Sequence, residues 1–188
     1  MDKEIHITER KAKTKGEAKE LRREKQIPVC IYSKGNVADT ASVGQVEFET
    51  ILREVESGFL STTIFALKTA NGKTRRAVVK EIQYKPTTYQ VLHLDFQELH
   101  DDSQIDIKVP VKCLNALDCA GVKLGGYLRS LMRHVKVRCL PRNIPNHFEI
   151  DVKELNLNQN RRVSDLVIPK DVRPLVKSHE IVVAVMKK

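Results

Sequence analysis

The sequence lacks any apolar run long enough to cross a membrane as a helix, which takes about 20 residues. Its longest apolar run near the C-terminus, IVVAVM at 181–186, has the length of a β-strand. The N-terminal residues MDKEIHITERK contain no apolar segment of the kind that secretory signals carry. We therefore expect a cytoplasmic protein with no membrane partner.

Common metal and nucleotide motifs are also absent. The four cysteines form no CxxC pair, and the six histidines form neither HxxxH nor HExxH. In a cytoplasmic protein such cysteines are expected to remain reduced thiols. The stretch AGVKLGGYLRSL at 120–131 lacks the Gly-Lys-Ser/Thr of a P-loop, and we assign its glycines to turns. These absences argue against a catalytic metal site and a phosphate-binding loop, and we expect no metal and no cofactor.

The sequence does have an excess of basic residues. It contains 33 lysines and arginines against 24 aspartates and glutamates, a formal net charge of +9. Hydrophobic residues make up 41% of the 188 residues, enough for a folded core in one or two domains. A folded protein with this charge is expected to meet a polyanionic partner, most simply nucleic acid.

The polar, acid-rich segment ELHDDSQID at 98–106 separates two apolar-patterned regions, and we place the domain boundary there. The first domain then covers residues 1–98 and the second covers residues 99–188. In the first domain, Asn71-Gly72 is a strong hairpin signal, and Gly58 is positioned to end a helix. The expected elements are strands at 6–10, 27–32, 61–70, 73–83 and 91–96, and helices at 16–26 and 46–58.

The second domain is richer in strands. Alternating or β-branched residues predict strands at 105–114, 134–140, 147–152 and 180–186, with one short helix around 164–166. The expected fold class is therefore mainly β with a few helices. An N-terminal small β-barrel-like domain with helices is followed by a β-rich second domain.

A basic cluster at positions 10–34 is the first candidate binding site. On a helix Lys19, Arg22 and Arg23 fall on one arc, and the three neighbouring glutamates group on another. Such segregation indicates a basic face directed at phosphates, for which the planar guanidinium group is well suited. The alternative is a solvated helix with internal ion pairs.

The stretch EIQYKPTTYQVLHLDF at 81–96 is the second candidate. Alternation places Leu92, Leu94 and Phe96 on the core side, and it places Val91, His93 and Asp95 on the open face of the sheet. With Gln83 upstream, this histidine and carboxylate suit the reading of RNA bases and ribose hydroxyls. A local hydrogen bond on a solvated face is the alternative. Similarly, Tyr32 at a strand end is either a buried tyrosine or a contact to ribose or base.

Taken together, these stretches resemble a known family. KGEAKELRREKQIPVCIYSKG (15–35) and EIQYKPTTYQVLHLDF (81–96) fit the family frame R-x-x-x-x-x-P-x-x-x-Y and Q-x-x-P…H-x-D-F. VPVKCLNALDCAGVKLGGYL (109–128) and HVKVRCLPRNIPNHFEIDVKEL (134–155) are similar to its second domain. The chain is identified as a member of the bacterial large-subunit ribosomal protein family called L-twenty-five, in its long two-domain Ctc (general stress protein) form.

The resemblance implies a structural ribosomal protein that is not an enzyme, has no small-molecule substrate, and binds 5S rRNA in the central protuberance through its first domain. It also implies a second domain that meets neighbouring large-subunit rRNA and ribosomal proteins, with the chain present as a monomer within the ribosome. Ala18-Lys19, Glu20 and Ser33 depart from the family's usual residues. The RNA-binding residues it implies are Arg10, Lys15, Lys19, Arg22, Tyr32, Gln83, His93 and Asp95.

Two other functions stay open from the sequence. One is a stress-induced RNA-binding regulatory module that acts partly off the ribosome. The other is a fragment of a tRNA synthetase, because the anticodon-binding part of glutaminyl-tRNA synthetase has a related fold. The sequence contains neither HIGH nor KMSKS, which argues against adenylation activity.

Overall fold

The computed structural model describes residues 3–10, 14–33, 38–69 and 72–187. The chain divides into two compact units, Met1–Ser103 and Gln104–Lys188. The sequence placed the boundary after residue 98, and the division falls after Ser103, inside the same polar segment.

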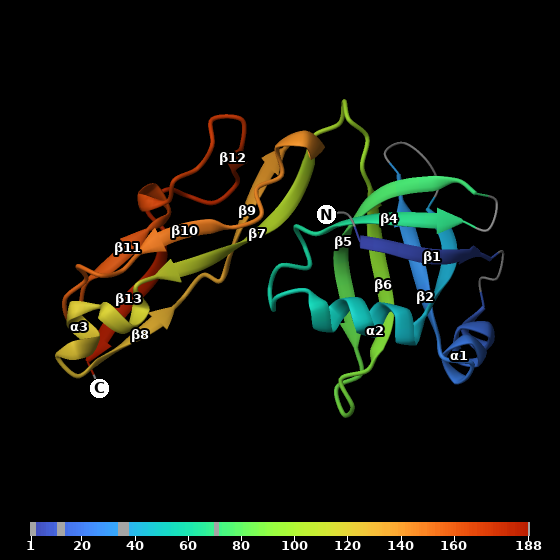
Figure 1. Cartoon of the computed structure of the whole chain (residues 1–188), viewed down its shortest axis with the longest axis horizontal. Helices are drawn as coiled ribbons and strands as arrows, with labels where there is room; N and C mark the ends of the chain where they lie inside the picture. The colour runs from blue at the N-terminus through green and yellow to red at the C-terminus, as the bar shows by residue number, and fades with distance from the viewer. Residues whose placement is uncertain (1–2, 11–13, 34–37, 70–71, 188) are drawn as a thin grey trace. The chain divides into compact units, whose positions relative to one another are not determined.

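The first unit is a closed six-stranded barrel with the strand order β1-β3-β2-β6-β5-β4 (Figure 1). Two of its contacts, β1 with β4 and β2 with β6, are parallel, and the others are antiparallel. The predicted barrel-like domain is confirmed. Its elements are β1 (Lys3–Glu9), α1 (Lys15–Arg23), β2 (Gln26–Tyr32), β3 (Asp39–Gly44), α2 (Gln45–Glu54), β4 (Ile64–Thr69), β5 (Thr74–Tyr84) and β6 (Val91–Glu98).

Apolar residues from every strand fill the barrel, and Phe65 and Phe96 meet edge to face with ring centroids 5.7 Å apart. The helix α2 packs on β1 and β3 and adds Phe48 and Ile51 to this core. It ends at Val55, in extended backbone, so Gly58 is not the predicted C-cap but a turn residue with φ of +92° farther on. The helix α1 packs on β2 and starts with a capping box between Thr14 and Glu17.

The predicted alternation along β6 is wrong at its start. Val91 is only 6% exposed and belongs to the barrel core, whereas Leu92 is not among the core residues. The pairing explains this, since Gln83 lies opposite His93 but the next residue, Tyr84, lies opposite Val91. Leu92 is therefore the extra residue of a β-bulge, which shifts the inward positions by one.

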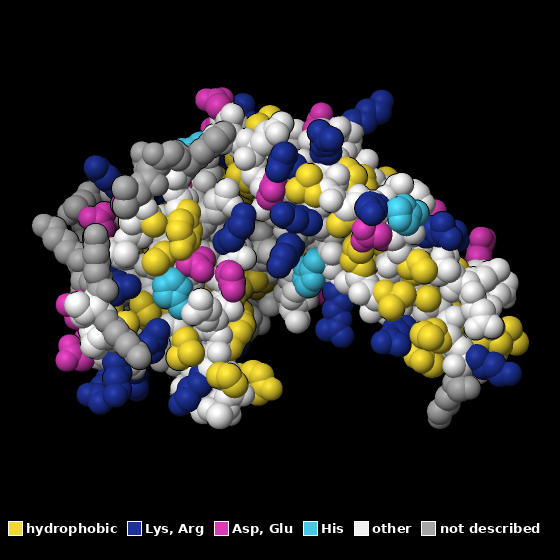
Figure 2. All heavy atoms as spheres, turned by 180° about the vertical axis from the view of Figure 1, so that it is seen from behind, with side chains coloured by type: hydrophobic (Ala, Val, Ile, Leu, Met, Phe, Trp, Pro, Cys, Tyr) yellow, Lys and Arg dark blue, Asp and Glu magenta, His cyan; other side chains and the backbone are white. Residues whose placement is uncertain are grey.

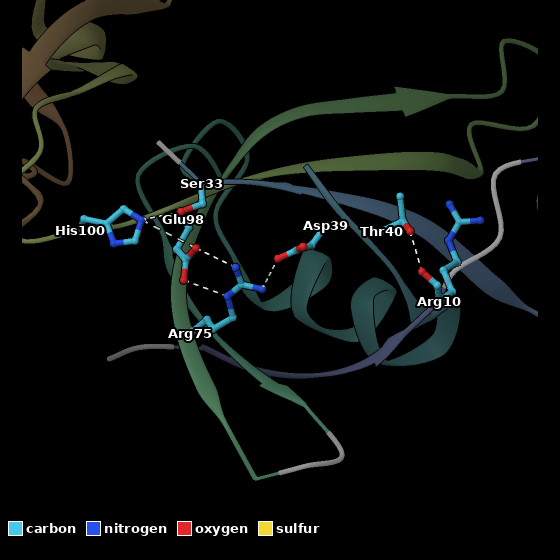
Figure 3. Close-up of polar contacts among 7 residues, drawn as sticks. All are labelled: Arg10, Ser33, Asp39, Thr40, Arg75, Glu98 and His100. Atoms are coloured by element: carbon cyan, nitrogen blue, oxygen red, sulfur yellow. Dashed lines mark hydrogen bonds and ion pairs between the residues drawn. The ribbon is translucent and has the colours of Figure 1, made fainter. Parts of the chain in front are cut away.

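An ion-pair network joins three strands of the barrel (Figure 3). Arg75 on β5 donates two hydrogen bonds of 2.8 Å to the carboxylate of Glu98 on β6 and one of 2.7 Å to Asp39 on β3. Ser33 Oγ and His100 Nε2 lie 2.7 Å apart beside it. Because Glu98 is 13% exposed and Arg75 24%, this bidentate pair is better shielded from solvent than an ordinary surface ion pair.

The second unit contains a four-stranded sheet, β10-β7-β9-β12, and a three-stranded sheet, β11-β13-β8 (Figure 1). Four predicted strands are confirmed as β7, β9, β10 and β13, and the short helix appears as the 3-10 helix η3. The elements are β7 (Ile105–Leu114), η1 (Ala116–Asp118), α3 (Ala120–Lys123), β8 (Gly126–Ser130), β9 (His134–Cys139), η2 (Pro141–Asn143), β10 (Phe148–Asp151), β11 (Asn160–Arg162), η3 (Val163–Asp165), β12 (Arg173–Pro174) and β13 (Ile181–Lys187).

The prediction that the glycines at 121–126 all lie in turns is wrong for two of them. Only Gly125 has a positive φ, +88°. Gly121 lies in α3 and Gly126 begins β8, and both allow close packing. A Cβ atom on Gly121 would lie 2.8 Å from the Asn156 carbonyl carbon and 2.8 Å from Val185 Cγ1. Gly121 and Gly126 are therefore required because neighbouring atoms leave no room for a side chain.

Hydrophobic side chains gather on the second unit near the C-terminus, over α3 and β8 (Figure 2). Exposed members there include Leu124, Tyr127 and Met186, and the Tyr127 hydroxyl lies 3.7 Å from the Met186 sulfur. Among the described residues, no helix is both long and apolar enough to span a membrane.

Candidate nucleic-acid interface

The candidate site is the outer face of three neighbouring barrel strands, β2, β6 and β5. Strand register places Cys30 opposite Asp95, and Asp95 opposite Glu81. Gln83 lies opposite His93 in the same way. Directly opposed residues share a face of the sheet, so the structure brings three predicted site residues, Gln83, His93 and Asp95, onto one surface.

His93 and Asp95 are less exposed than the sequence suggested. Their side chains are only 19% and 16% accessible, so they do not stand on an open, solvated face. His93 lies between two neighbours, with Nε2 3.5 Å from the Cys30 sulfur and Nδ1 3.4 Å from Asp95 Oδ1. Sequence reasoning missed Cys30, since only the pairing of β2 with β6 brings it to this histidine.

Burial and neighbouring charges shift the pKa values of both Cys30 and His93. Burial raises the pKa of the Cys30 thiol, and the charge of Asp95 raises it further. Burial also lowers the pKa of His93, despite the opposing effect of Asp95, so the imidazole is neutral near pH 7. The Cys30 sulfur lies 3.5 Å from Nε2, and which of the two atoms donates depends on the tautomer of the imidazole.

Two polar atoms of this pair lack hydrogen-bond partners within the described part of the chain. His93 Nδ1 and Asp95 Oδ1 are buried, and their 3.4 Å approach does not have the alignment of a hydrogen bond. A buried polar group left unsatisfied costs about 1–3 kcal/mol. Such a cost at a surface site is consistent with groups that complete their hydrogen bonds on a ligand.

Tyr32 lies at the end of β2, next to this pair, and is 47% exposed. The buried alternative for this tyrosine is therefore wrong. The negative charge of Asp95 raises the pKa of the Tyr32 phenol, which shows that the two groups are neighbours. The ring is available for stacking on a base or a ribose.

Arg10 approaches the site from the end of β1. Its Nε donates a 3.0 Å hydrogen bond to the carbonyl of Ala41 on β3. Its own backbone carbonyl accepts a 2.7 Å bond from Thr40 Oγ1 (Figure 3). Ala41 pairs with Val29, the residue before Cys30 in β2. The Arg10 charge lowers the pKa values of both His93 and Cys30.

Arg22 reaches the site from α1. Its Nε donates a 3.0 Å hydrogen bond to the carbonyl of Leu92, the bulged residue of β6, and its charge also lowers the pKa of His93. The bulge thus provides the acceptor that holds this arginine. The other predicted residues of this helix are less informative, since Lys19 is exposed with no described contact to the site and the side chain of Lys15 lies outside the described residues.

The Cys30, His93 and Asp95 donor atoms lie within 4.8 Å of one another, a spacing that a metal ion tolerates. The approaches of Cys30 and Asp95 use opposite nitrogens of the imidazole, however, and one ion binds only one of them. The arrangement therefore does not direct all three donors at one point, as a three-ligand metal centre requires.

Known proteins resemble both halves of this chain. The model of the Ribosomal L25p family matches residues 5–96, which include the whole candidate site. The model of Ribosomal protein TL5, C-terminal domain, matches residues 104–188.

Full-length relatives agree with these matches. Large ribosomal subunit protein bL25 of Chlamydia abortus is 42% identical over 185 residues, covering 98% of this chain and 100% of the relative. The proteins of the same name from Chlamydia pneumoniae and Chlamydia trachomatis serovar L2 are each 39% identical with the same coverage.

Proposed function

The chain belongs to the bL25 family of large ribosomal subunit proteins, and from this premise we propose that its first domain binds 5S rRNA in the central protuberance. Family membership indicates a structural, non-enzymatic role in the large subunit. We place the protein in the cytoplasm with the ribosome, as a single copy that also contacts neighbouring rRNA and ribosomal proteins. No observation favours the stress-regulatory alternative or the synthetase fragment, and we do not propose either.

The observation that carries the proposal is the convergence of two anchored arginines on a strand face with polar side chains. Arg10 and Arg22 each use Nε to bind a backbone carbonyl, of Ala41 and Leu92 respectively. This leaves the two outer nitrogens of each guanidinium to donate to phosphate oxygens. An arginine held in this way loses less side-chain entropy when it binds.

Between these arginines, the strand face supplies groups that distinguish RNA from a simple polyanion. Asp95 accepts hydrogen bonds from ribose hydroxyls or base amino groups, and Gln83 both donates and accepts. Tyr32 offers an exposed ring for stacking. A wide, shallow RNA minor groove presents these hydroxyls and base edges to a flat protein surface. We propose that the arginines fix the backbone while Asp95, His93 and Gln83 read the groove.

The decisive experiment compares two carboxylates that lie opposite each other. Asp95→Asn should weaken binding to 5S rRNA by about 1–3 kcal/mol, because an acceptor is replaced by an amide donor. Glu81→Gln is the matched control, since Glu81 lies directly across from Asp95 on β5 and is exposed. Removing that charge should leave binding unchanged or slightly tighter. Affinities are measured by gel shift at one salt concentration, with thermal melting to verify folding.

If the face acted only through its charge, both variants would bind RNA more tightly. A folded Asp95→Asn protein with unchanged or increased affinity would contradict the proposal.

A further inference from the structure

The positive charge of the chain lies mostly outside the domain that carries the candidate 5S site. Residues 1–103 contain 17 lysines and arginines against 16 acidic residues, a net charge of +1. Residues 104–188 contain 16 against 8, a net charge of +8. The second unit therefore has the electrostatic signature of a nucleic-acid-binding domain in its own right.

Part of this charge is arranged on one face of the four-stranded sheet. The inward residues of β7 and β9, such as Val109 and Val137, are buried, and the residues between them point outward. Strand register sets Lys108 directly opposite Lys136, and it sets Arg138 directly opposite Arg173 on β12. Cross-strand pairs of like charge destabilise a sheet.

Asp106 lies on the same face and moderates this repulsion. It accepts hydrogen bonds of 2.6 and 3.1 Å from Arg138, and it also lies 3.7 Å from Lys136 Nζ. Arg138 and Lys136 remain 46% and 53% exposed, so both still face solvent. The face therefore presents exposed cations that can attract an anionic partner.

We propose that this basic face, defined by Lys108, Lys136, Arg138 and Arg173, is a second RNA-binding surface that holds the phosphate backbone of duplex RNA other than 5S rRNA. The outward positions of β9 are His134, Lys136 and Arg138, so this strand offers no apolar side chain to insert into a lipid bilayer. The identity of the polyanion rests on the proposed role in rRNA binding.

The contacts of this surface differ in kind from those of the barrel. Lysine ammonium groups act on phosphates as point charges, and the Arg138 guanidinium is already committed to Asp106 through Nε and one outer nitrogen. Binding here should therefore follow the shape and charge of an RNA helix and not its sequence. Such a surface holds the second domain against rRNA while the barrel selects 5S rRNA.

The test uses the full chain, saturated with 5S rRNA so that the barrel site is occupied. The probe is a fluorescent RNA duplex of about 16 base pairs, the length that a double-stranded RNA-binding domain spans. The complex should capture the duplex, and the logarithm of its affinity should fall linearly with the logarithm of the salt concentration between about 50 and 200 mM.

Lys108→Gln/Lys136→Gln should reduce duplex affinity on the order of tenfold and lower the salt slope by about two, one for each phosphate contact. Lys123→Gln/Lys153→Gln is the control, because it removes the same charge from two exposed lysines near Asp118. It should change duplex affinity by less than a few-fold.

Equal losses in the two double variants would overturn the proposal, because domain charge alone would then account for capture. Preference for polyglutamate or for anionic phosphatidylglycerol vesicles over the duplex would overturn it as well. The result is independent of the barrel site, because Asp95→Asn should change 5S affinity and leave duplex capture by the free protein unaltered.

Discussion

The two domains of this protein use charge in different ways. The barrel is nearly neutral, yet it holds two arginines, a tyrosine, a histidine and a carboxylate around one strand face. The second domain has eight more basic than acidic residues, and its clearest basic face is built from like-charge pairs. In our proposal, net charge does not locate the site that reads RNA. Positioned hydrogen-bonding groups read RNA in the barrel, and electrostatic attraction dominates in the second domain.

The largest expected effect comes from a substitution that lowers the stability of the second domain and leaves the barrel unchanged. Gly121→Ala would place a Cβ atom 2.8 Å from backbone and side-chain atoms of the second domain. Overpacking of this kind costs about 1–3 kcal/mol or more. We expect the second domain to melt earlier while affinity for 5S rRNA stays within a few-fold of the original. Calorimetry and gel shifts on the full chain measure both, and a large loss of 5S binding would show that the comparison is wrong.

The complementary change weakens the barrel alone. Arg75→Ala leaves Glu98, 13% exposed, without its bidentate partner. Losing the partner of a partly buried charge should cost about 2 kcal/mol, below the range for fully buried pairs. Arg76→Ala, which removes an exposed arginine of the same strand, is the control. Urea denaturation should show the barrel transition at lower urea with Arg75→Ala, and a second-domain transition that does not move.

Acidification should also lower the stability of the barrel in two separate pH ranges, one set by Glu98 and one by His93. Hydrogen bonding to Arg75 lowers the pKa of Glu98, so this carboxylate stabilises the fold above pH 4.5, its unfolded value, and the contribution disappears as pH falls through the folded value. Burial lowers the pKa of His93 below 6.5. Below pH 6.5 the unfolded chain then binds the proton more readily, and stability falls by at most about 1.4 kcal/mol per pH unit.

Thermal melting between pH 7.5 and about 5.5 isolates the histidine, because the Glu98 effect lies at lower pH. His93→Gln should flatten this part of the barrel's stability profile. An unchanged slope would mean that His93 is not the group responsible.

The smallest expected effect concerns the residue that the sequence did not suggest. Cys30→Val keeps the volume close to that of cysteine but removes the thiol that lies 3.5 Å from His93 Nε2. Without the thiol, the imidazole loses a hydrogen-bonding neighbour that orients the ring beside Asp95. We expect a few-fold loss of 5S affinity, about 0.5–1 kcal/mol for a weak hydrogen bond. Cys113→Val is the control, since Cys113 lies in the second domain. Tighter binding by Cys30→Val would exclude an orienting role.

Local patterns in the sequence were sufficient for much of the fold. Turn residues and alternation correctly predicted the hairpin of β4 and β5 and the main strands of the second domain. They missed the very short strands β11 and β12, and they also missed β3 and β8. Asp39–Gly44 is short and polar at its start, and the glycines before β8 were assigned to turns. The error at Val91 has a related cause, since a bulge changes the inward side within a strand and depends on the partner strand.

For the site, residue types alone define the chemical groups: arginines for phosphate, and a histidine and an aspartate two residues apart for hydrogen bonding. How these groups meet depends on contacts between distant strands. Parallel pairing of β2 with β6 adds Cys30 and Tyr32 to the pair, and the bulge at Leu92 turns a carbonyl toward Arg22. The like-charge rows of the second domain also exist only through strand register. Residue type sets which interactions are possible, but their strength depends on distance and burial, which contacts between distant segments create.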